Sequence, residues 1–168
     1  MHPAALPVEK LMRECTVKKV RRSGPGGQHR NKVETGVRIR HEPTGTEAEA
    51  SESRSAEINR KAAVQRLRVK LALEAREPVP EDYRPSELLA GRTRGGRIAV
   101  NPSHPDFPAL LAEVMDVLAS CDMDVRSAAE LLGCSATQLV KFLSLEPAAL
   151  EMVNARREEL GLRRLKGR

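Results

Sequence analysis

Apolar and polar residues alternate along short stretches in the first third of the chain, which is the pattern of half-buried β-strands. Residues 37–40, Val-Arg-Ile-Arg, alternate strictly, so one face of a strand is expected to be buried and the other exposed. Residues 15–20 are expected to form a strand before it, and residues 47–50 a weaker one after a Pro-Thr-Gly turn at residues 43–45. The pattern therefore predicts a small antiparallel sheet.

Beyond this sheet the apolar period changes to that of a helix. From about Ser55 onward, Ala63, Leu67 and Leu71 recur on one helical face, and Pro78 disfavours helix in the residue before it. One helix is expected to pack on the sheet.

Residues 78–105 differ in composition from the rest of the chain. They combine repeated prolines with Arg92, Arg94, Gly95, Gly96 and Arg97. Such a composition is typical of an extended, solvated linker, and a contact of its basic cluster with RNA is the alternative.

The C-terminal third predicts a small bundle of four short helices. Asp106, Asp124 and Ser135 are each expected to cap a helix, and Gln138 is expected to complete a capping box with Ser135. A fourth helix is expected over residues 147–160, before a glycine.

A helix-turn-helix pattern lies within this bundle. Ala129, Gly133 and Leu139 have the spacing of its small residue, its turn glycine and its buried apolar residue. Any three-helix bundle with a tight turn gives the same spacing. Ribosomal RNA, DNA or protein therefore stay open as partners of residues 125–145.

Together these elements predict an α+β fold, in which a small antiparallel sheet with a glycine loop and one packing helix precedes a small helical bundle. We expect a first domain at residues 1–77, a Pro/Gly/Arg-rich linker at 78–105, and a helical domain with a basic C-terminal tail at 106–168.

The charge of the chain favours a polyanionic partner. The chain carries 29 Lys and Arg against 23 Asp and Glu, a net charge of +6, which suits nucleic acid, although a surface built for solubility is the alternative. Basic residues gather in residues 16–41 and 156–168, with an acidic stretch at 42–57 between them. Two separated patches fit a two-point contact with a phosphate surface, and solvated segments are the alternative.

The remaining composition favours a reducing compartment. Cys15, Cys121 and Cys134 are few, odd in number and far apart, which indicates buried free thiols rather than a disulfide framework or a metal finger. Residues 1–15 lack the apolar run of a signal peptide, and no segment has the roughly 18 apolar residues of a membrane span. A cytoplasmic protein without membrane, metal or cofactor is expected.

The candidate chemistry lies in the loop R-R-S-G-P-G-G-Q-H at residues 21–29. Gly26 and Gly27 can adopt positive φ and let another backbone approach closely. Gln28 is neutral at ordinary pH and cannot act as a base. Such a loop offers main-chain N–H groups to a developing oxyanion and positions water. His29 is a weaker candidate for a base, because no nucleophile or orienting carboxylate accompanies it.

The loop stands in the longer run R-R-S-G-P-G-G-Q-H-R-N-K-V-E-T-G-V-R-I-R-H-E-P-T-G, followed by R-S-A-E-I-N-R-K-A-A. Over about residues 15–75 the chain closely resembles the catalytic (GGQ) domain of bacterial class I peptide chain release factors and of their stand-alone relatives that rescue stalled ribosomes. The resemblance implies that the loop enters the peptidyl transferase centre. There the N–H of Gln28 would stabilise the tetrahedral intermediate formed on the peptidyl-tRNA ester, and its side chain would select water.

The resemblance implies a catalytic role for Gly26, Gly27 and Gln28. It also implies the ribosome with its peptidyl-tRNA as partner, and a glutamine methyltransferase that modifies Gln28. From the resemblance and the basic patches together, contacts with ribosomal RNA or tRNA are expected for Arg21, Arg22, Ser23, His29, Arg30, Asn31, Lys32, Arg54, Arg163, Arg164 and Lys166.

Full-length release factors of this class carry stop-codon-reading domains, and nothing in these residues resembles one. Codon-independent release, the rescue of stalled ribosomes, is therefore expected, with the basic residues 156–168 in the empty mRNA channel. The alternative is a DNA-binding regulator that uses residues 125–145 and carries a non-catalytic first domain.

Overall fold

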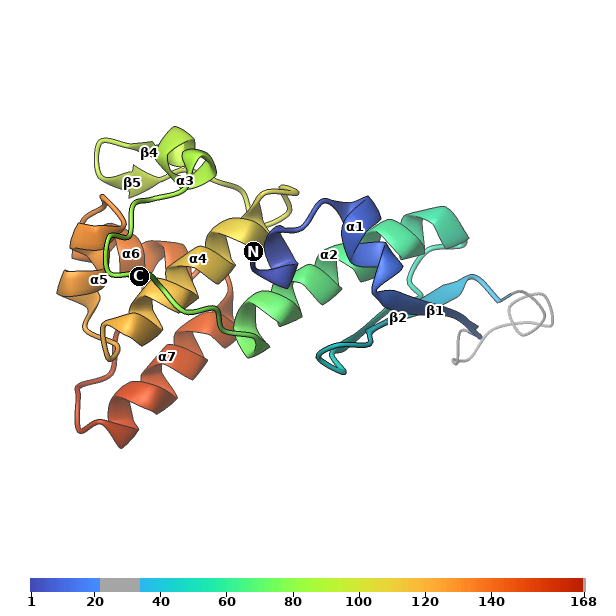
Figure 1. Cartoon of the computed structure of the whole chain (residues 1–168). Coiled ribbons are helices and arrows are strands. Elements are labelled where there is room, and N and C mark those ends of the chain that lie inside the picture. The colour runs from blue at the N-terminus through green and yellow to red at the C-terminus, as the bar shows by residue number, and fades with distance from the viewer. Residues whose placement is uncertain (22–33, 168) are drawn as a thin grey trace.

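The computed structural model describes residues 1–21 and 34–167, and Figure 1 shows them as an elongated α+β fold with the sheet at one end. The elements of the first part are η1 (Pro3–Ala5), α1 (Val8–Arg13), β1 (Cys15–Val20), β2 (Gly36–His41), β3 (Glu47–Ala50) and α2 (Ala56–Glu74). They are followed by α3 (Glu87–Arg92), β4 (Thr93–Arg94), β5 (Arg97–Ile98), α4 (Phe107–Ser120), α5 (Val125–Leu131), α6 (Ala136–Leu143) and α7 (Pro147–Glu159).

The predicted antiparallel sheet is confirmed, with the strand order β1-β2-β3. Strand β2 lies in the middle and pairs with both neighbours, so that Ile39 is opposite Val17 on one side and Ala48 on the other. Val37, Ile39 and Ala48 are buried, as the alternating pattern requires, and α2 packs on this part of the sheet. Strand β1 is an edge strand whose side chains are mostly exposed.

Helix α2 begins where the sequence predicts, because the Ser55 hydroxyl accepts a hydrogen bond from the N–H of Ile58. The predicted face of Ala63, Leu67 and Leu71 is fully buried. A second row is buried as well, formed by Val64, Arg68 and Ala72, which the apolar pattern did not indicate because a charged residue lies in it. Helix α2 therefore packs on two sides.

The second row of α2 faces the N-terminal turn η1 and the start of α4. The Arg68 guanidinium, 8% exposed, donates to the carbonyl of Ala4 at 3.0 Å and to that of Pro105 at 2.7 Å. Removing this cation from water costs free energy, and its hydrogen bonds to two carbonyls offset part of that cost. Three segments far apart in the sequence thus meet at one side chain.

The four predicted C-terminal helices are confirmed as α4 to α7, with two of the three expected caps. The Asp124 carboxylate accepts from the N–H of Ser127 at 2.7 Å, and the Ser135 hydroxyl accepts from that of Gln138 at 3.2 Å. The cap predicted at Asp106 is wrong, because its carboxylate accepts from the Arg92 guanidinium at 2.6 Å and makes no side-chain cap bond. The capping box at Ser135 is only half formed, because the N–H of Ser135 donates instead to the carbonyl of Gly96 at 3.0 Å.

Residues 78–105 contain more structure than the expected extended linker. Helix α3 and the β4–β5 hairpin lie within them, with Leu89 fully buried and Ile98 4% exposed. Elements of two to six residues are too short to give an apolar period, which is why composition alone suggested a linker. The division into domains at residues 1–77, 78–105 and 106–168 stays a prediction.

The three cysteines are free thiols that are only partly buried, rather than fully buried as expected. Burial raises the pKa of the Cys134 thiol, which keeps it protonated. None of the helices in residues 1–21 and 34–167 has both the length and the apolarity needed to span a membrane.

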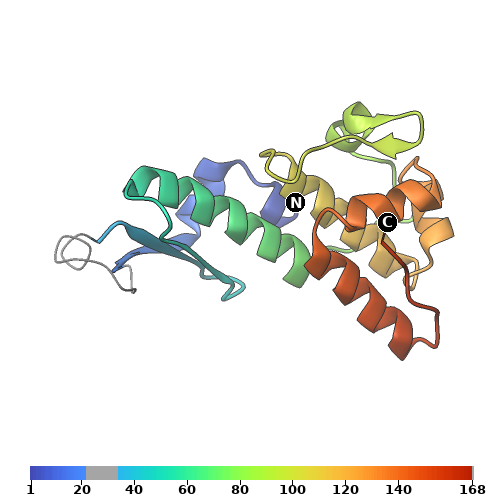
Figure 2. The ribbon, with the colours of Figure 1, turned by 180° about the vertical axis from the view of Figure 1, so that it is seen from behind.

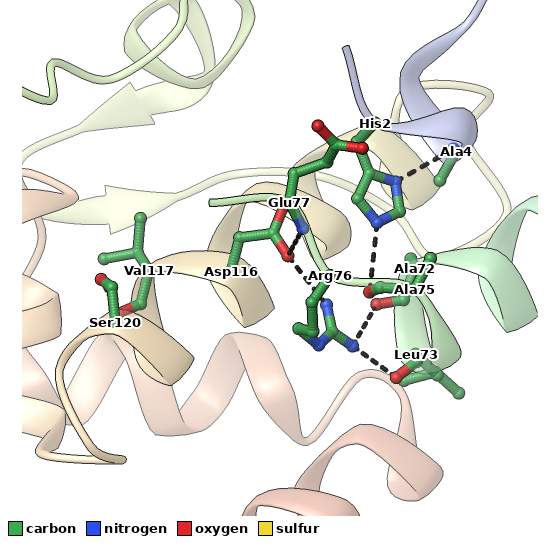
Figure 3. Close-up of polar contacts among 10 residues, drawn as sticks. All are labelled: His2, Ala4, Ala72, Leu73, Ala75, Arg76, Glu77, Asp116, Val117 and Ser120. Carbon is green, nitrogen blue, oxygen red and sulfur yellow. Dashed lines mark hydrogen bonds and ion pairs between the residues drawn. The ribbon is translucent and has the colours of Figure 1, made fainter. Parts of the chain in front are cut away.

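The end of α2 is fixed to α4 through a buried carboxylate (Figure 3). Asp116, 7% exposed, accepts from the Arg76 guanidinium and from the N–H of Glu77, each at 3.1 Å. The same guanidinium donates to the carbonyls of Ala72 and Leu73 in the last turn of α2, where a positive charge is favourable. This cluster sets the direction in which the chain leaves α2.

His2 closes the same junction from the N-terminal side. Its Nδ1 accepts from the N–H of Ala4 at 3.0 Å, and its Nε2 lies 3.3 Å from the carbonyl of Ala75, to which it donates in the neutral tautomer. Both bonds together require the neutral imidazole with its hydrogen on Nε2. Burial lowers the pKa of His2 below the ordinary value of 6.5, an effect that the hydrogen bond to Ala75 opposes in part.

The free energy of unfolding is expected to fall as the pH drops below about 6.5. Because the pKa of His2 is lower in the folded than in the unfolded chain, its contribution is complete above the unfolded-state value and is lost as the pH falls through the folded-state value. Urea unfolding between about pH 7.5 and about pH 5.5 should show a smaller decline for His2→Gln than for wild type. Arg60→Gln, which changes an exposed residue without an imidazole, is the control and should keep the wild-type decline. Equal declines for His2→Gln and wild type would contradict the assignment.

Candidate functional site

The tip of the sheet holds both ends of the segment that carries the candidate chemistry. Val20, the last residue of β1, pairs with Gly36, the first of β2. Just beyond them, the Arg21 guanidinium donates to the Glu34 carboxylate at 3.0 Å. The described residues on either side of residues 22–33 therefore lie together.

Most of the predicted site falls in that segment. The expected catalytic residues Gly26, Gly27 and Gln28 lie outside the described residues. So do several expected RNA contacts, namely Arg22, Ser23, His29, Arg30, Asn31 and Lys32.

Gly36 allows the two strands to close at the tip. A Cβ on Gly36 would lie 2.7 Å from both the carbonyl oxygen and Cγ2 of Val20, and 3.1 Å from Cβ of Ser51. A backbone atom this close cannot move aside, so a side chain here would push β1 and β2 apart. The sequence alone did not indicate this role of Gly36, because the role depends on which residue of β1 lies opposite it.

Asn59 anchors the returning end of the segment to α2. Its side chain is 1% exposed, and its Nδ2 donates to the carbonyl of Thr35 at 2.7 Å and to that of Ser53 at 2.9 Å. Its Oδ1 accepts from the N–H of Ser53 at 2.9 Å. The amide thus ties the residue after Glu34, the turn before α2 and the first turn of α2 into one unit. The sequence placed Asn59 at the helix start without indicating this role.

On the outer face of the sheet, the register of β2 and β3 places glutamates opposite arginines, so part of the positive charge is neutralised. Arg38 is opposite Glu49 and donates to it at 2.8 Å, while Arg40 donates to Glu47 at 3.0 Å. These two arginines counted as part of the predicted basic patch, and the acidic stretch that comes after them in sequence folds back to pair with them. In the described part of the chain, by contrast, no carboxylate lies within 4.0 Å of Lys18 or Lys19 on β1. The excess positive charge of the sheet is therefore at its β1 edge.

Of the predicted RNA contacts that the structure describes, Arg21 and Arg54 lie near the tip. Arg54 is exposed in the turn before α2, and residues 1–21 and 34–167 place no acidic partner within 4.0 Å of it. The other three, Arg163, Arg164 and Lys166, are exposed beyond α7. Figure 1 shows that the sheet and α7 lie in different parts of the molecule, so the structure does not bring these two groups together.

The C-terminal residues fold back along α7 rather than extending away from it (Figure 2). Asn154, 2% exposed, accepts from the N–H of Leu165 at 2.6 Å and donates to its carbonyl at 3.0 Å. Arg164 is held by two carboxylates of α7, those of Glu151 at 2.8 Å and Glu158 at 3.0 Å. The two carboxylates more than offset the charge of Arg164. Among the described residues after α7, Arg163 and Lys166 are therefore the cations without a carboxylate within 4.0 Å.

No group of three or more His, Cys, Asp or Glu side chains that could bind a metal ion occurs in the described ranges 1–21 and 34–167. The described part of the site thus consists of hydrogen-bonded backbone, the buried amide of Asn59 and exposed cations.

Comparison with known proteins places this sheet-and-helix unit among release-factor domains. Residues 8–96, more than half of the 168 residues, match the RF-1 domain. The chain therefore belongs to the RF-1 domain family, and the predicted membership in the family of class I release factor catalytic domains is confirmed.

Individual relatives are longer than this chain. It is 42% identical over 67 residues to peptide chain release factor 2 of Buchnera aphidicola, with 40% of this chain and 18% of that protein covered. It is 49% identical over 51 residues to peptide chain release factor 2 of Neisseria meningitidis serogroup B, with 30% and 14% covered. It is 31% identical over 129 residues to peptide chain release factor 1 of Frankia casuarinae, with 66% and 36% covered. The chain thus spans between 14% and 36% of the length of these relatives.

Substitution of the anchoring amide should loosen the base of the tip. Asn59→Ala removes the hydrogen bonds to the carbonyls of Thr35 and Ser53 and to the N–H of Ser53, and of these groups the Ser53 carbonyl keeps the Thr35 hydroxyl as a donor. The loss should lower the free energy of unfolding by about 1–3 kcal/mol. Urea unfolding measures this change, and Arg60→Ala, which alters the exposed neighbour, should stay within about 0.5 kcal/mol of wild type. Hydrogen exchange should also show faster exchange of the Ser53 amide, and unchanged protection there would contradict the role of Asn59.

Proposed function

We propose that this protein hydrolyses the ester of peptidyl-tRNA on the ribosome, independently of the codon, and so releases chains from stalled ribosomes. The observation that supports it most is the sheet tip, where Val20, Gly36 and Asn59 bring both ends of the Gly-Gly-Gln segment together. This tip lies at one end of an elongated molecule, away from the helical part, as a segment that must reach into a catalytic centre requires (Figure 1). The match to the RF-1 domain supports the same reaction.

The proposed chemistry assigns a main-chain role to Gln28. Water attacks the ester carbonyl, a bond to the water oxygen forms, and the bond to the 3′ oxygen of the tRNA breaks as that oxygen takes up a proton. The N–H of Gln28 donates to the developing oxyanion, while the Gln28 side chain positions water and Gly26 and Gly27 give the backbone its shape. The ribosome holds the ester in place, so the isolated protein should be nearly inert.

Codon independence forms part of the proposal because the chain continues after α2 into a helical part suited to RNA phosphates. This helical part packs on α2 and bears exposed cations, Arg163 and Lys166 among them, which suit sequence-independent contact with RNA. Ribosomal RNA and peptidyl-tRNA are the proposed partners, together with a methyltransferase acting on Gln28, in the cytoplasm.

A DNA-binding regulator is the second candidate, and the α5–α6 pair favours it. Ala129 and Leu139 are buried and Gly133 has a φ of +71°, as a helix-turn-helix requires. This candidate predicts sequence-selective binding of duplex DNA without hydrolysis on ribosomes.

Changes in the Gly-Gly-Gln segment should abolish peptide release. Gln28→Ala removes the side chain that selects water, and Gly27→Ala resists the backbone shape that places the Gln28 amide, so single-turnover release should fall about 100-fold to 1,000-fold. The measurement uses labelled peptidyl-tRNA on ribosomes whose A site holds no stop codon. Gly91→Ala is the matched control, because an added Cβ there meets no described atom within 4 Å, and it should release peptide like wild type. Equal release by wild type and all three variants would reject the catalytic assignment.

The C-terminal cations are proposed to contact the mRNA channel of ribosomes whose message has ended. Entry into the channel requires the Asn154–Leu165 pair to open, whereas Arg163 and Lys166 already face solvent. Arg163→Gln with Lys166→Gln should reduce release on ribosomes with a truncated message several-fold more than on ribosomes whose channel is filled. An equal effect on both would show that the tail binds elsewhere.

A further inference from the structure

A short β-hairpin presents two arginines at a fixed spacing. Strands β4 and β5 are joined by Gly95 and Gly96, whose φ values of +55° and +73° form a tight two-residue turn. Arg94 and Arg97 stand directly opposite each other on either side of this turn, and both are exposed. Two like charges in this position destabilise a strand pair, so the arrangement favours an anion that binds both.

The hairpin is fixed to the helix-turn-helix pair rather than projecting freely. The carbonyl of Gly96 accepts from the N–H of Ser135, the cap of α6, at 3.0 Å. Ile98 is buried, and the hairpin and α6 together enclose a hollow of about 230 Å³ lined by residues that include Arg97, Gln138 and Lys141. Figure 1 shows the hairpin above α5 and α6.

Helix α6 is the second helix of the helix-turn-helix and exposes one side. Leu139, Phe142 and Leu143 are buried, whereas Thr137 and Lys141 are exposed. The exposed side of the first turn thus carries a small hydroxyl residue, whereas Gln138, the one amide side chain of this turn, is half-buried and lines the hollow beside the hairpin.

Cations lie on both sides of the exposed face of α6. Arg97 and Lys141 share the hollow on one side, and Arg126 lines a second hollow with Thr137 on the other. Asp124 also lines the second hollow, where Arg157, a further lining residue, offsets its negative charge. Within residues 1–21 and 34–167, no carboxylate lies within 4.0 Å of the charged groups of Arg94, Arg97, Arg126 or Lys141, in contrast to Arg38, Arg40 and Arg92.

We propose that the hairpin–α6 surface, formed by Arg94, Arg97, Arg126, Thr137 and Lys141, binds the sugar-phosphate backbone of a folded RNA. The inference rests on the proposed function, because it supplies a second contact with ribosomal RNA far from the sheet tip. Arg94, Arg97 and Arg126 lie on the hairpin and on α5 rather than along the exposed face of α6. Cations that flank a helix in this way suit phosphate contacts, which position a protein without reading sequence. The deep, narrow major groove of an RNA duplex also excludes a helix, so contact falls on phosphates and 2′-hydroxyls.

The test compares two variants of equal charge. Arg94→Gln with Arg97→Gln removes the opposed pair, whereas Arg13→Gln with Arg84→Gln removes two exposed arginines elsewhere. Binding of a short RNA duplex is measured over a range of salt concentrations, with thermal unfolding to verify that both variants are folded. The hairpin variant should bind several-fold more weakly, and its slope of log K against log salt should be smaller by about 2. The control variant should keep the wild-type slope.

Equal slopes for both variants would overturn the proposal, and so would tighter, sequence-selective binding to a DNA duplex of matched length. Failure of the proposed function is distinguished by peptide release on stalled ribosomes. If both proposals hold, the hairpin variant needs a higher concentration but reaches the wild-type plateau rate, while Gln28→Ala binds RNA like wild type and releases nothing. RNA binding with the expected slope change but no release by wild type would reject the hydrolase and leave the RNA surface standing.

Discussion

Helix α2 is the element on which the other parts of the described structure depend, because it buries two rows of side chains against different neighbours. Its row of Ala63, Leu67 and Leu71 is fully buried, and full burial of a leucine contributes about 1.5–3 kcal/mol. Its second row includes Arg68, which joins the N-terminal turn to the start of α4. A helix held on two sides cannot shift against the sheet without disturbing the helical part. The position of the sheet tip relative to α4–α7 is therefore fixed by one helix rather than by a flexible connection.

Local patterns predicted most of the regular structure. The strict alternation at residues 37–40 and the helical period from Ser55 each involve several residues, so they indicated the sheet and α2 correctly. The caps Asp124 and Ser135 were found for the same reason, since a cap bonds within one turn. The features that the sequence did not indicate depend on distant partners. Asp106 was expected to cap α4, yet it pairs with Arg92, and nothing local distinguishes these two outcomes.

The candidate site divides in the same way. The Gly-Gly-Gln motif and its neighbours were evident from the sequence, but the parts that hold the base of the segment were not. Gly36 matters because of its register with Val20, and Asn59 because of Thr35, a residue 24 positions earlier. The predicted basic patch was too large for a related reason. Arg38 and Arg40 pair with glutamates of β3, which reach them only because the chain turns back. The linker prediction likewise overlooked a hairpin whose stability comes from docking on α6.

Within residues 1–21 and 34–167, no strand pairs with the edge of β1 that faces away from β2, and this bears on self-association of the fold. An unpaired strand is a template for another strand, and proteins protect such edges with lysines. Lys18 and Lys19 are consecutive, so they place a charge on both faces of the edge strand. A second molecule pairing edge to edge would bring four ammonium groups together, which keeps the sheet from growing. Variants without these charges would be prone to pair with one another through β1. The two lysines should therefore be retained even where contact with RNA does not require them.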